Sequence, residues 1–447
     1  MTVSKQRALI MGLGLFGGGA GAARYLAKQG WQVLVTDLRS EEELADGLAQ
    51  LEGVACEFRL GCHQEADFAA ADLVVANPAV PPNNRYLRLA EEGGAHIVSE
   101  LGLFLEAATC RLVLITGTAG KSSSTCFLVN LLQAAGLKCH LGGNLGGSLL
   151  GELPNLTSSH IVCLEVSSYQ LEALQQKPHP GVELVAITNL GQDHLERHGS
   201  LEEYAEAKAR ILTLAAPGAS AVLPTQLHAD PLFACPLRIL DHPGNGPGEM
   251  QLALESGPVS LANLPPMPDF QRANARLALL LGHCLGLTTK QLESGLAHLQ
   301  PPPHRAEELG QRRGVRVVDN GVSTTPEATL AVLAGEPECV TLVLGGQAKQ
   351  GLEFDDLAAT CARRGDRLVL FGQAASSIAQ ACARAGLEPD CAETFEQAIY
   401  GALERTPLGG TLLFSPSCAS FDTHKNFKDR ADCFRALLPS LDGPTPR

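Results

Sequence analysis

Short runs of aliphatic and β-branched residues recur along this chain, and most of them end in glycine or polar residues. Such runs are typical of strands that are buried on both faces of a sheet. Segments with helical spacing of apolar residues separate many of the runs, and this alternation predicts an α/β fold with parallel sheets. The predicted strands are 8–11, 31–36, 71–76, 111–115, 160–164, 184–188, 315–318, 341–344, 367–371 and 411–414.

The strand at 111–115 leads into a turn with the composition of a phosphate-binding loop. Its sequence is Gly117-Thr118-Ala119-Gly120-Lys121-Ser122, and residues 123–133 have the composition of a helix. Backbone N–H groups of such a turn and the helix N-terminus bind an anion, Lys121 can reach the terminal phosphates, and Ser122 can hold Mg²⁺. The general motif GxxxxGK[ST] would place glycine at Ile115, so this is a shortened variant. A glycine-rich β–α turn with a chance Lys-Ser pair is the alternative.

A second glycine-rich turn follows the first strand. Residues 12–17 fit the pattern GxGxxG, a helix is predicted to continue to about Gln29, and Asp37 lies twenty residues after Gly17. This order is typical of a dinucleotide-binding βαβ unit, with the acidic residue placed to hold a ribose hydroxyl. The same turn serves any nucleotide diphosphate, which we favour over NAD. A purely structural βα turn is the remaining alternative.

Two more strands end in side chains suited to a metal. The strand at 160–164 is followed by Glu165, and the strand at 184–188 is followed after a short loop by His194. In open parallel sheets, ligands bind outside the carboxyl ends of the strands, so Ser122, Glu165 and His194 are expected to face one crevice. The pattern predicts a Mg²⁺–nucleotide site. Taken singly, Glu165 would more often be a helix cap and His194 a loop histidine; their shared position at the sheet edge favours the metal site.

Lys208 stands out in the predicted helix 201–214. Leu201, Tyr204, Lys208 and Ile211 follow helical spacing and therefore share one face. A free ammonium group in this apolar stripe would be costly unless it is paired or neutralised. The alternative is a lysine whose amine extends to solvent.

Composition narrows the class of protein. The chain has 447 residues, 45% hydrophobic and 18% charged, with a net charge of −14, which argues against a nucleic-acid-binding surface. Fourteen cysteines without metal-ligand spacing suggest reduced thiols, and no stretch is apolar and long enough to span a membrane. We therefore expect a cytoplasmic protein. We also expect a monomer that acts on small molecules, although composition does not decide this.

A chain of this length is expected to form several domains. We predict a Rossmann-like domain over 1–107, a central P-loop ATPase-like domain with a parallel sheet over 108–301, and a C-terminal Rossmann-like α/β domain over 302–447. Residues 224–268, rich in proline and glycine, are predicted to form a small irregular β region. The three consecutive prolines at 301–303 mark the second boundary.

Taken together, six motifs resemble the Mur ligases. They are GTAGKS, EVSSYQLE, NLGQDHLERHGSLEEYAEAK, PHR, LGGQAK and SPSCASFDTHKNFKDR, in this order along nearly the whole chain. The last motif is the most specific and resembles the glutamate-adding member of the family. The resemblance implies an ATP-dependent amide ligase that joins D-glutamate to UDP-N-acetylmuramoyl-L-alanine through an acyl phosphate in peptidoglycan synthesis. Ligation of L-glutamate, or another Mur-type or folylpolyglutamate-type reaction, is the alternative.

The resemblance also implies the roles of individual residues. Lys121, His194 and Lys208 would act in catalysis, and Lys208 would be carbamylated, which turns its cation into an anion able to bind Mg²⁺. The metal site would comprise Ser122, Glu165, His194 and Lys208. ATP would contact Gly117, Thr118, Ala119, Gly120, Lys121, Ser122, Ser123, Asn274, Arg305 and Asp319. The UDP-linked substrate would contact Leu15, Phe16, Asp37, Arg39, Asn77 and Asn144. Glutamate would contact Lys349, Ser420 and Phe427.

The chain departs from the family pattern at two places. Ala119 replaces the asparagine usual in the loop, which removes a side-chain contact but leaves the backbone cradle. Residues 319–325, DNGVSTT, replace the usual DSKAT stretch, so its lysine is absent. Both changes bear on substrate contacts, whereas the retained Lys349 and SPSCAS block favour D-glutamate.

Overall fold

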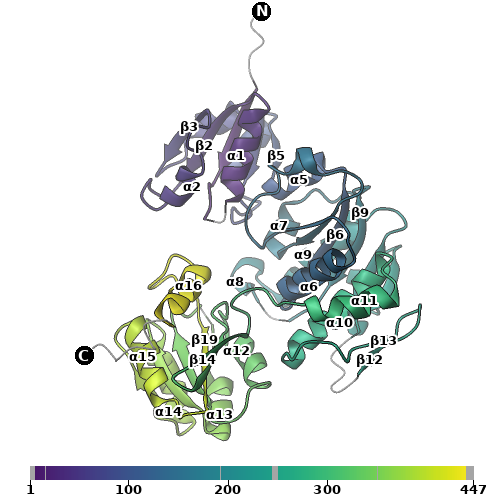
Figure 1. Ribbon diagram of the computed structural model, residues 1–447. Coiled ribbons are helices and arrows are strands. Elements are labelled where there is room, and N and C mark those ends of the chain that lie inside the picture. Colours follow the sequence, from purple (N-terminus) through teal and green to yellow (C-terminus); the bar gives the residue numbers. More distant parts are fainter. Residues whose placement is uncertain (1–5, 16, 192, 244–249, 350, 439–447) are drawn as a thin grey trace, which may run out of the picture. The chain divides into compact units, whose positions relative to one another are not determined.

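The computed structural model describes residues 6–438, except 16, 192, 244–249 and 350. Three main α/β sheets follow one another along this part of the chain, which confirms the predicted fold class (Figure 1). The chain divides into two compact units, with a boundary between Gln300 and Pro301. Pro266–Arg272 belongs with the second unit. The boundary between the first two predicted domains, near residue 107, lies within the first unit and stays a prediction.

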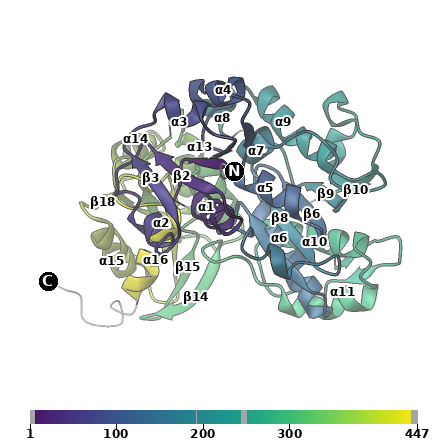
Figure 2. The same cartoon turned by 90° about the horizontal axis from the view of Figure 1, so that it is seen from above.

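The first sheet has five parallel strands in the order β3-β2-β1-β4-β5. Its strands are β1 (Arg7–Met11), β2 (Gln32–Asp37), β3 (Cys56–Leu60), β4 (Leu73–Ala76) and β5 (His96–Val98). Helices α1 (Gly18–Lys28) and α5 (Glu100–Ala107) pack on one face, and α3 (Glu65–Ala69) and α4 (Arg85–Glu92) pack on the other. Helix α1 contacts β2, and Figure 2 shows the two elements next to each other.

The central sheet has six parallel strands in the order β11-β10-β9-β6-β8-β7. Its strands are β6 (Arg111–Thr116), β7 (Cys139–Gly143), β8 (Ile161–Glu165), β9 (Val182–Ile187), β10 (Ser220–Leu223) and β11 (Arg238–Asp241). Helix α6 (Lys121–Ala134) packs on this sheet, and α10 (Asp269–Cys284) and α11 (Thr289–Gly295) lie beside α6 (Figure 1). Because β6 lies between β9 and β8, the loops after these three strands share one edge.

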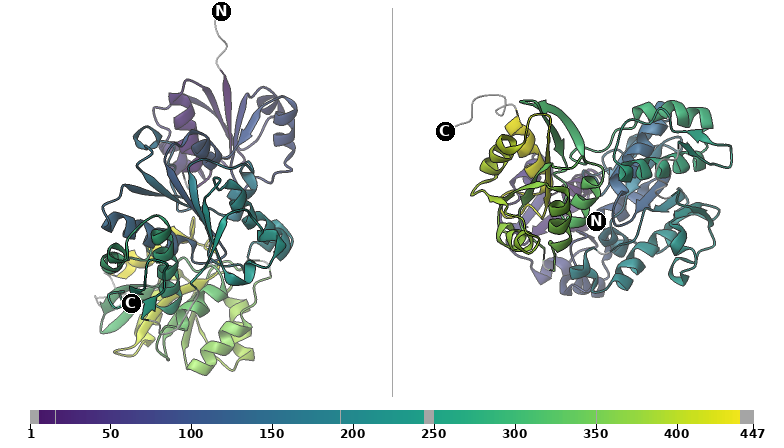
Figure 3. Two further views of the ribbon diagram at one scale, coloured as in Figure 1. Left: turned by 90° about the vertical axis from the view of Figure 1, so that its right-hand side faces the viewer. Right: turned by 90° about the horizontal axis from the view of Figure 1, so that it is seen from below.

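The third sheet has the order β14-β15-β19-β16-β17-β18, and only β14 runs antiparallel to its neighbour. Its strands are β14 (Glu307–Arg312), β15 (Val315–Asp319), β16 (Thr341–Gly345), β17 (Arg367–Phe371), β18 (Asp390–Cys391) and β19 (Thr411–Ser417). One face packs against α12 (Pro326–Leu333), α13 (Asp355–Arg364) and α14 (Ala375–Arg384). The other packs against α15 (Phe395–Arg405) and α16 (Phe427–Leu437), so helices cover both faces (Figure 3).

Two predictions for residues 201–214 need correction. The helix predicted over 201–214 ends as α9 (Leu201–Ala209) and continues as a 3₁₀ helix, Arg210–Leu214. Leu201 is 41% exposed, so it does not belong to the buried stripe. The region 224–268 contains the short strands predicted for it: β11 joins the edge of the central sheet, and β12 (Gln251–Leu252) pairs with β13 (Val259–Ser260). Within the described residues, every helix is too short or too polar to cross a membrane.

Candidate active site

The loop between β6 and α6 requires glycine at two positions. Gly117 has φ +144°, and a Cβ there would lie 1.9 Å from Thr188 Oγ1. Gly120 has φ +81°, and a Cβ there would lie 2.4 Å from Asn274 Oδ1. Both positions combine a left-handed conformation with a close neighbour, which only glycine tolerates. The loop is therefore packed tightly between β9 and α10, and Asn274 lies against it.

Two lysine amines bind the same carbonyl oxygen of this loop. Lys121 Nζ donates to Gly117 O at 2.9 Å and to Thr118 O at 2.8 Å. Lys208 Nζ donates to Gly117 O at 2.8 Å. Since both amines converge on one oxygen, their positive charges would repel each other strongly. The structure thus brings Lys208 directly to the phosphate-binding loop.

Lys208 is buried, with 1% of its surface exposed. Its amine lies 4.3 Å from the centre of the Tyr204 ring, and the Tyr204 hydroxyl donates to Thr118 Oγ1 at 3.3 Å. Burial, and then the charge of Lys121, lower the pKa of Lys208 to about 6. The extension of this lysine to solvent is therefore ruled out, and its amine is largely neutral near pH 7.

Ser122 and Glu165 meet as the order of strands predicts. Ser122 Oγ donates to Glu165 Oε2 at 2.5 Å, and Asn144 Nδ2 donates to Glu165 Oε1 at 2.8 Å. The backbone N–H of Asn144 also donates to the Glu165 carbonyl at 2.8 Å. Glu165 is 2% exposed, so its carboxylate is oriented by side chains from two neighbouring loops. A hydroxyl and a carboxylate are oxygen donors of the kind that Mg²⁺ prefers.

His194 lies in the loop after β9 with a left-handed backbone, φ +54°. Its Nδ1 lies 3.4 Å from the Tyr169 hydroxyl and its Nε2 lies 3.4 Å from Asp193 Oδ2. In the described part of the chain, no three His, Cys, Asp or Glu side chains gather closely enough to form a metal site by themselves. The structure therefore joins Ser122 to Glu165, whereas the contacts described for His194 are with Tyr169 and Asp193.

The side chain of Asn189 holds the backbone of Ala119, a contact that sequence reasoning missed. Asn189 Oδ1 accepts from the Ala119 N–H at 2.9 Å, and Asn189 Nδ2 donates to Ala119 O at 3.1 Å. Thr188 Oγ1 also donates to Ala119 O, at 2.5 Å. The loop has alanine at position 119, and the amide of a neighbouring asparagine binds both the N–H and the C=O of this residue. Its position at the end of a predicted strand was the available signal.

The GxGxxG turn uses the predicted acidic residue as a structural support. Asp37 Oδ2 accepts from the Leu13 N–H and Asp37 Oδ1 from the Arg39 N–H, both at 2.9 Å. Asn77 lies so close to the turn that a Cβ on Gly14 would be 2.7 Å from its Nδ2. Asp37 is 5% exposed, so its carboxylate supports the loop backbone.

The other residues predicted to contact the UDP-linked substrate differ in exposure. Leu15 is 42% exposed and Arg39 is also exposed. Phe16 lies outside the described residues. Both described side chains are therefore accessible to a ligand at this turn.

In the second unit, Asp319 is fully buried within an ionic cluster. Its Oδ2 lies 2.7 Å from His304 Nδ1 and accepts from Arg435 Nε at 2.8 Å, while Oδ1 accepts from the Gly321 N–H at 2.9 Å. Arg435 also pairs with Glu307. The sequence did not indicate these partners. In the described structure, Asp319 has no solvent-exposed surface. Arg305 is half-buried, and its carbonyl accepts from Gln271 Nε2 at 3.4 Å.

The residues predicted to bind glutamate lie at the strand carboxyl ends of the third sheet. Ser420 is 2% exposed, and its Oγ has no hydrogen-bond partner among the described residues. Phe427 is 37% exposed at the first position of α16, and Lys349 is half-buried after β16. A buried hydroxyl without a partner is costly, so Ser420 is suited to bind a ligand.

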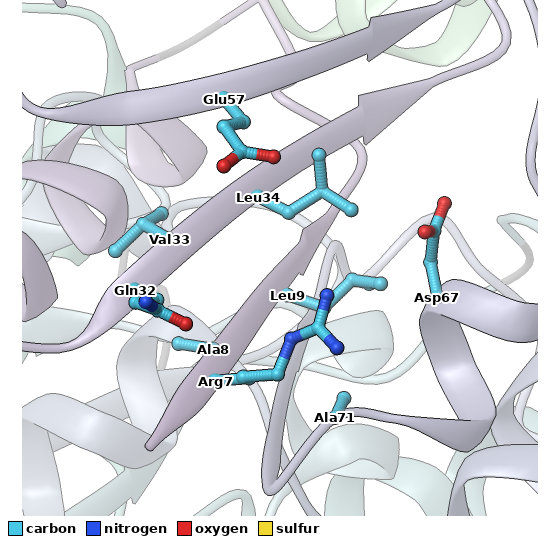
Figure 4. Close-up of a pocket in the computed structure, with 9 residues that line it drawn as sticks. All are labelled: Arg7, Ala8, Leu9, Gln32, Val33, Leu34, Glu57, Asp67 and Ala71. Carbon is cyan, nitrogen blue, oxygen red and sulfur yellow. The ribbon is translucent and has the colours of Figure 1, made fainter. Parts of the chain in front are cut away.

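A separate hollow lies in the first sheet, away from these residues. Figure 4 shows it at the amino ends of β1 and β2, where Arg7, Gln32 and Leu34 line it together with Glu57 and Asp67. Ligands of parallel sheets bind at the opposite, carboxyl edge. This hollow therefore does not belong to the predicted nucleotide site.

Comparison with known proteins agrees with this geometry. Residues 6–99 match the Mur ligase MurD-like N-terminal domain and residues 115–233 match the Mur ligase middle domain. A UDP-N-acetylmuramoylalanine–D-glutamate ligase of Roseiflexus sp. (strain RS-1) is 33% identical, over 99% of this chain and 100% of that protein. This chain belongs to the Mur ligase family. The equally named protein of Geobacter metallireducens is 32% identical over 99% of both chains.

Solved structures of other Mur ligases share the fold. MurF from Acinetobacter baumannii superposes with a TM-score of 0.62 at 17% identity, covering 97% of this chain and 93% of that one. MurF from Thermotoga maritima, solved in complex with ADP, gives a TM-score of 0.59 at 17% identity, covering 98% and 99%. At this level of identity the comparison concerns the fold alone.

Proposed function

We propose that this Mur ligase joins D-glutamate to UDP-N-acetylmuramoyl-L-alanine in peptidoglycan synthesis, with conversion of ATP to ADP and phosphate. The main support for this proposal is the loop after β6. Lys121, the Ser122–Glu165 pair and the buried Lys208 all lie at this loop. This arrangement suits phosphoryl transfer, which depends mainly on positioning and on stabilising phosphate charge. The D-glutamate ligases that match over the whole chain supply the substrate pair.

The reaction has two steps. A carboxylate oxygen of the L-alanyl group attacks the γ-phosphorus of ATP, the bond from that phosphorus to the bridging oxygen breaks, and ADP leaves. The amine of D-glutamate then attacks the acyl carbon, the new C–N bond forms, the C–O bond breaks and inorganic phosphate leaves. Lys121, now held on Gly117 O and Thr118 O, would turn to the phosphates and stabilise their charge.

Mg²⁺ would be held by Ser122 and Glu165, with His194 as a further ligand. The oxygen donors of the first two residues fit this ion, which usually takes one or two carboxylates together with phosphates and water. When bound, Mg²⁺ neutralises phosphate charge. Asn144 would orient the Glu165 carboxylate for this purpose.

Lys208 would carry a carbamate. Its neutral amine attacks CO₂, forms an N–C bond and releases one proton, so the side chain becomes an anion. The low pKa of this lysine, caused by burial and by Lys121, supplies the neutral amine that the addition requires. The new negative charge would also remove the repulsion between the two amines that now share Gly117 O.

The remaining predicted contacts complete the proposal. The GxGxxG turn with Leu15, Arg39 and Asn77 would bind the uridine diphosphate part of the substrate. Asp37 would hold the backbone of this turn through its hydrogen bonds to the N–H groups of Leu13 and Arg39. Lys349, Ser420 and Phe427 would bind glutamate, and the unpartnered Ser420 hydroxyl supports this assignment.

Isotope transfer tests the acyl phosphate directly. The L-alanyl carboxylate of the UDP-linked substrate is labelled with ¹⁸O, and the enzyme is incubated with ATP, Mg²⁺ and D-glutamate. One labelled oxygen should appear in the released inorganic phosphate, because the attacking carboxylate oxygen leaves with it. Unlabelled phosphate, formed together with ligated product, would contradict this route.

A further inference from the structure

Arg430 is the largest fully buried side chain of the described structure, and it ties three strand ends together. It projects from the first turn of α16, and its exposed fraction is 0%. Its guanidinium donates to five backbone carbonyls: Cys418 O at 2.9 Å, Ala419 O at 3.2 Å, and Gly321 O, Ser323 O and Gly345 O at 3.4 Å. These carbonyls follow or end β15, β16 and β19, which are neighbours in the third sheet.

The positive charge of Arg430 has no direct counterion. Among the described residues, no carboxylate lies within salt-bridge distance of its guanidinium, although the charge of Asp422 acts on it at longer range, and its Nε has no hydrogen-bond partner. Burial lowers the pKa of Arg430 to about 10, still well above neutral pH. Burying an unpaired ion costs several kcal/mol, of which the carbonyl dipoles offset only a part. A neutral side chain such as glutamine would avoid this cost but has only two N–H donors, so it could not bind all five carbonyls.

The segments that Arg430 joins also carry the proposed amino-acid site. Ser420 directly follows Ala419, Phe427 lies one helical turn before Arg430, and Lys349 lies four residues after Gly345. The loops are further paired by Gln347, whose N–H donates to Ala419 O at 2.8 Å and whose carbonyl accepts from the Ala419 N–H at 3.0 Å. A displacement of any one loop would therefore move the groups expected to hold glutamate.

We propose that Arg430 is a positioning residue for the acidic amino-acid substrate: from the helix that begins with Phe427, its buried guanidinium fixes the loops that carry Lys349 and Ser420. This inference rests on the proposed function. A planar guanidinium presents five N–H donors in a rigid fork and reaches all three loops, whereas an ammonium offers three donors on a flexible chain. Charge alone is therefore not expected to substitute for Arg430.

The test compares KM values for D-glutamate and for ATP in Arg430→Gln and Arg430→Lys. Both variants are expected to raise KM for D-glutamate roughly tenfold or more, while KM for ATP changes by less than about threefold. Arg364→Gln is the matched control. Arg364 also donates to backbone carbonyls, Pro337 O at 2.6 Å and Glu336 O at 3.3 Å, but it lies at the amino ends of β16 and β17. It should lower the melting temperature without changing either KM.

The outcomes separate the possibilities. Equal increases in both KM values, or an unchanged KM for D-glutamate in a folded variant, would overturn the positioning role. Full recovery by Arg430→Lys would show that charge alone suffices and would equally overturn it. If Arg430→Gln does not fold, the Arg430→Lys values decide by the same criteria. Absence of D-glutamate-dependent turnover in the unaltered protein would instead reject the proposed function, and this inference with it.

Discussion

Asn189 binds both backbone atoms of Ala119, and this pair shows how the loop keeps its shape without an asparagine of its own. The amide that meets the loop comes from Asn189, just after the neighbouring strand β9. A single residue such as Asn189 can thus hold the backbone of the loop after β6 in place before the nucleotide binds. The same holds for Lys208, whose environment rather than its sequence neighbours sets its chemistry.

Asn189→Ala is expected to lower kcat/KM for ATP by roughly tenfold to a hundredfold. Two hydrogen bonds of about 1 kcal/mol each are lost, and the loop that holds the phosphates becomes less ordered. Steady-state ADP release at varied ATP measures the change. Asn155→Ala, in an exposed turn of the same domain, is the control. A change below about twofold would remove Asn189 from the loop's support.

Lys208→Ala should lose at least about a hundredfold of its activity, because an anion expected at the metal would be missing. A small carboxylate such as formate should partly restore ADP release. The exposed Lys177→Ala serves as the control. Activity equal to that of the unaltered protein would show that Lys208 has no role, and failure of every small carboxylate to restore activity would argue against the carbamate.

At the scale of elements, the side chains of the candidate active site lie at the carboxyl ends of parallel strands. Ser122, Glu165 and Asn189 come from loops far apart in sequence, and the order β9-β6-β8 brings them to one edge. Helix ends also hold ionisable side chains: Ser99 caps α5, and the next residue, Glu100, is half-buried and accepts a hydrogen bond from Ser148.

Glu100 makes stability depend on pH. Burial raises its pKa from 4.5 to about 7, although the hydrogen bond from Ser148 lowers it. The pKa of Glu100 is higher in the folded protein than in the unfolded chain. Its contribution to the free energy of unfolding is therefore fully present below pH 4.5 and is lost as the pH rises through 7.

Glu100→Gln should therefore be more stable than the unaltered protein at pH 8, by about 2 kcal/mol, and similar at pH 5. Urea unfolding at the two pH values measures this, with the exposed Glu91→Gln as the control. If the free energy of unfolding depends on pH in the same way in Glu100→Gln and in the unaltered protein, the raised pKa of Glu100 is not the cause of that dependence.

At the scale of the whole molecule, the sequence predicted what depends on local pattern. The α/β class, the strand before each glycine-rich turn and the burial of Lys208 follow from short periodicities, and the structure confirms them. Sheet order, the antiparallel β14 and the addition of β11 depend on pairing between distant segments. The same limit applies to side chains: Asp319 meets Arg435, 116 residues away, and Arg430 meets Gly321, 109 residues away. No local pattern contains such contacts.

The central claim is the substrate pair, and ADP release tests it most directly. The full chain is given ATP, Mg²⁺ and UDP-N-acetylmuramoyl-L-alanine, with D-glutamate, L-glutamate, L-lysine or meso-diaminopimelate in separate reactions. We predict that ADP is released with D-glutamate and not with the other amino acids. ADP release that requires L-glutamate or a diamino acid, or none with any of them, would contradict the proposal.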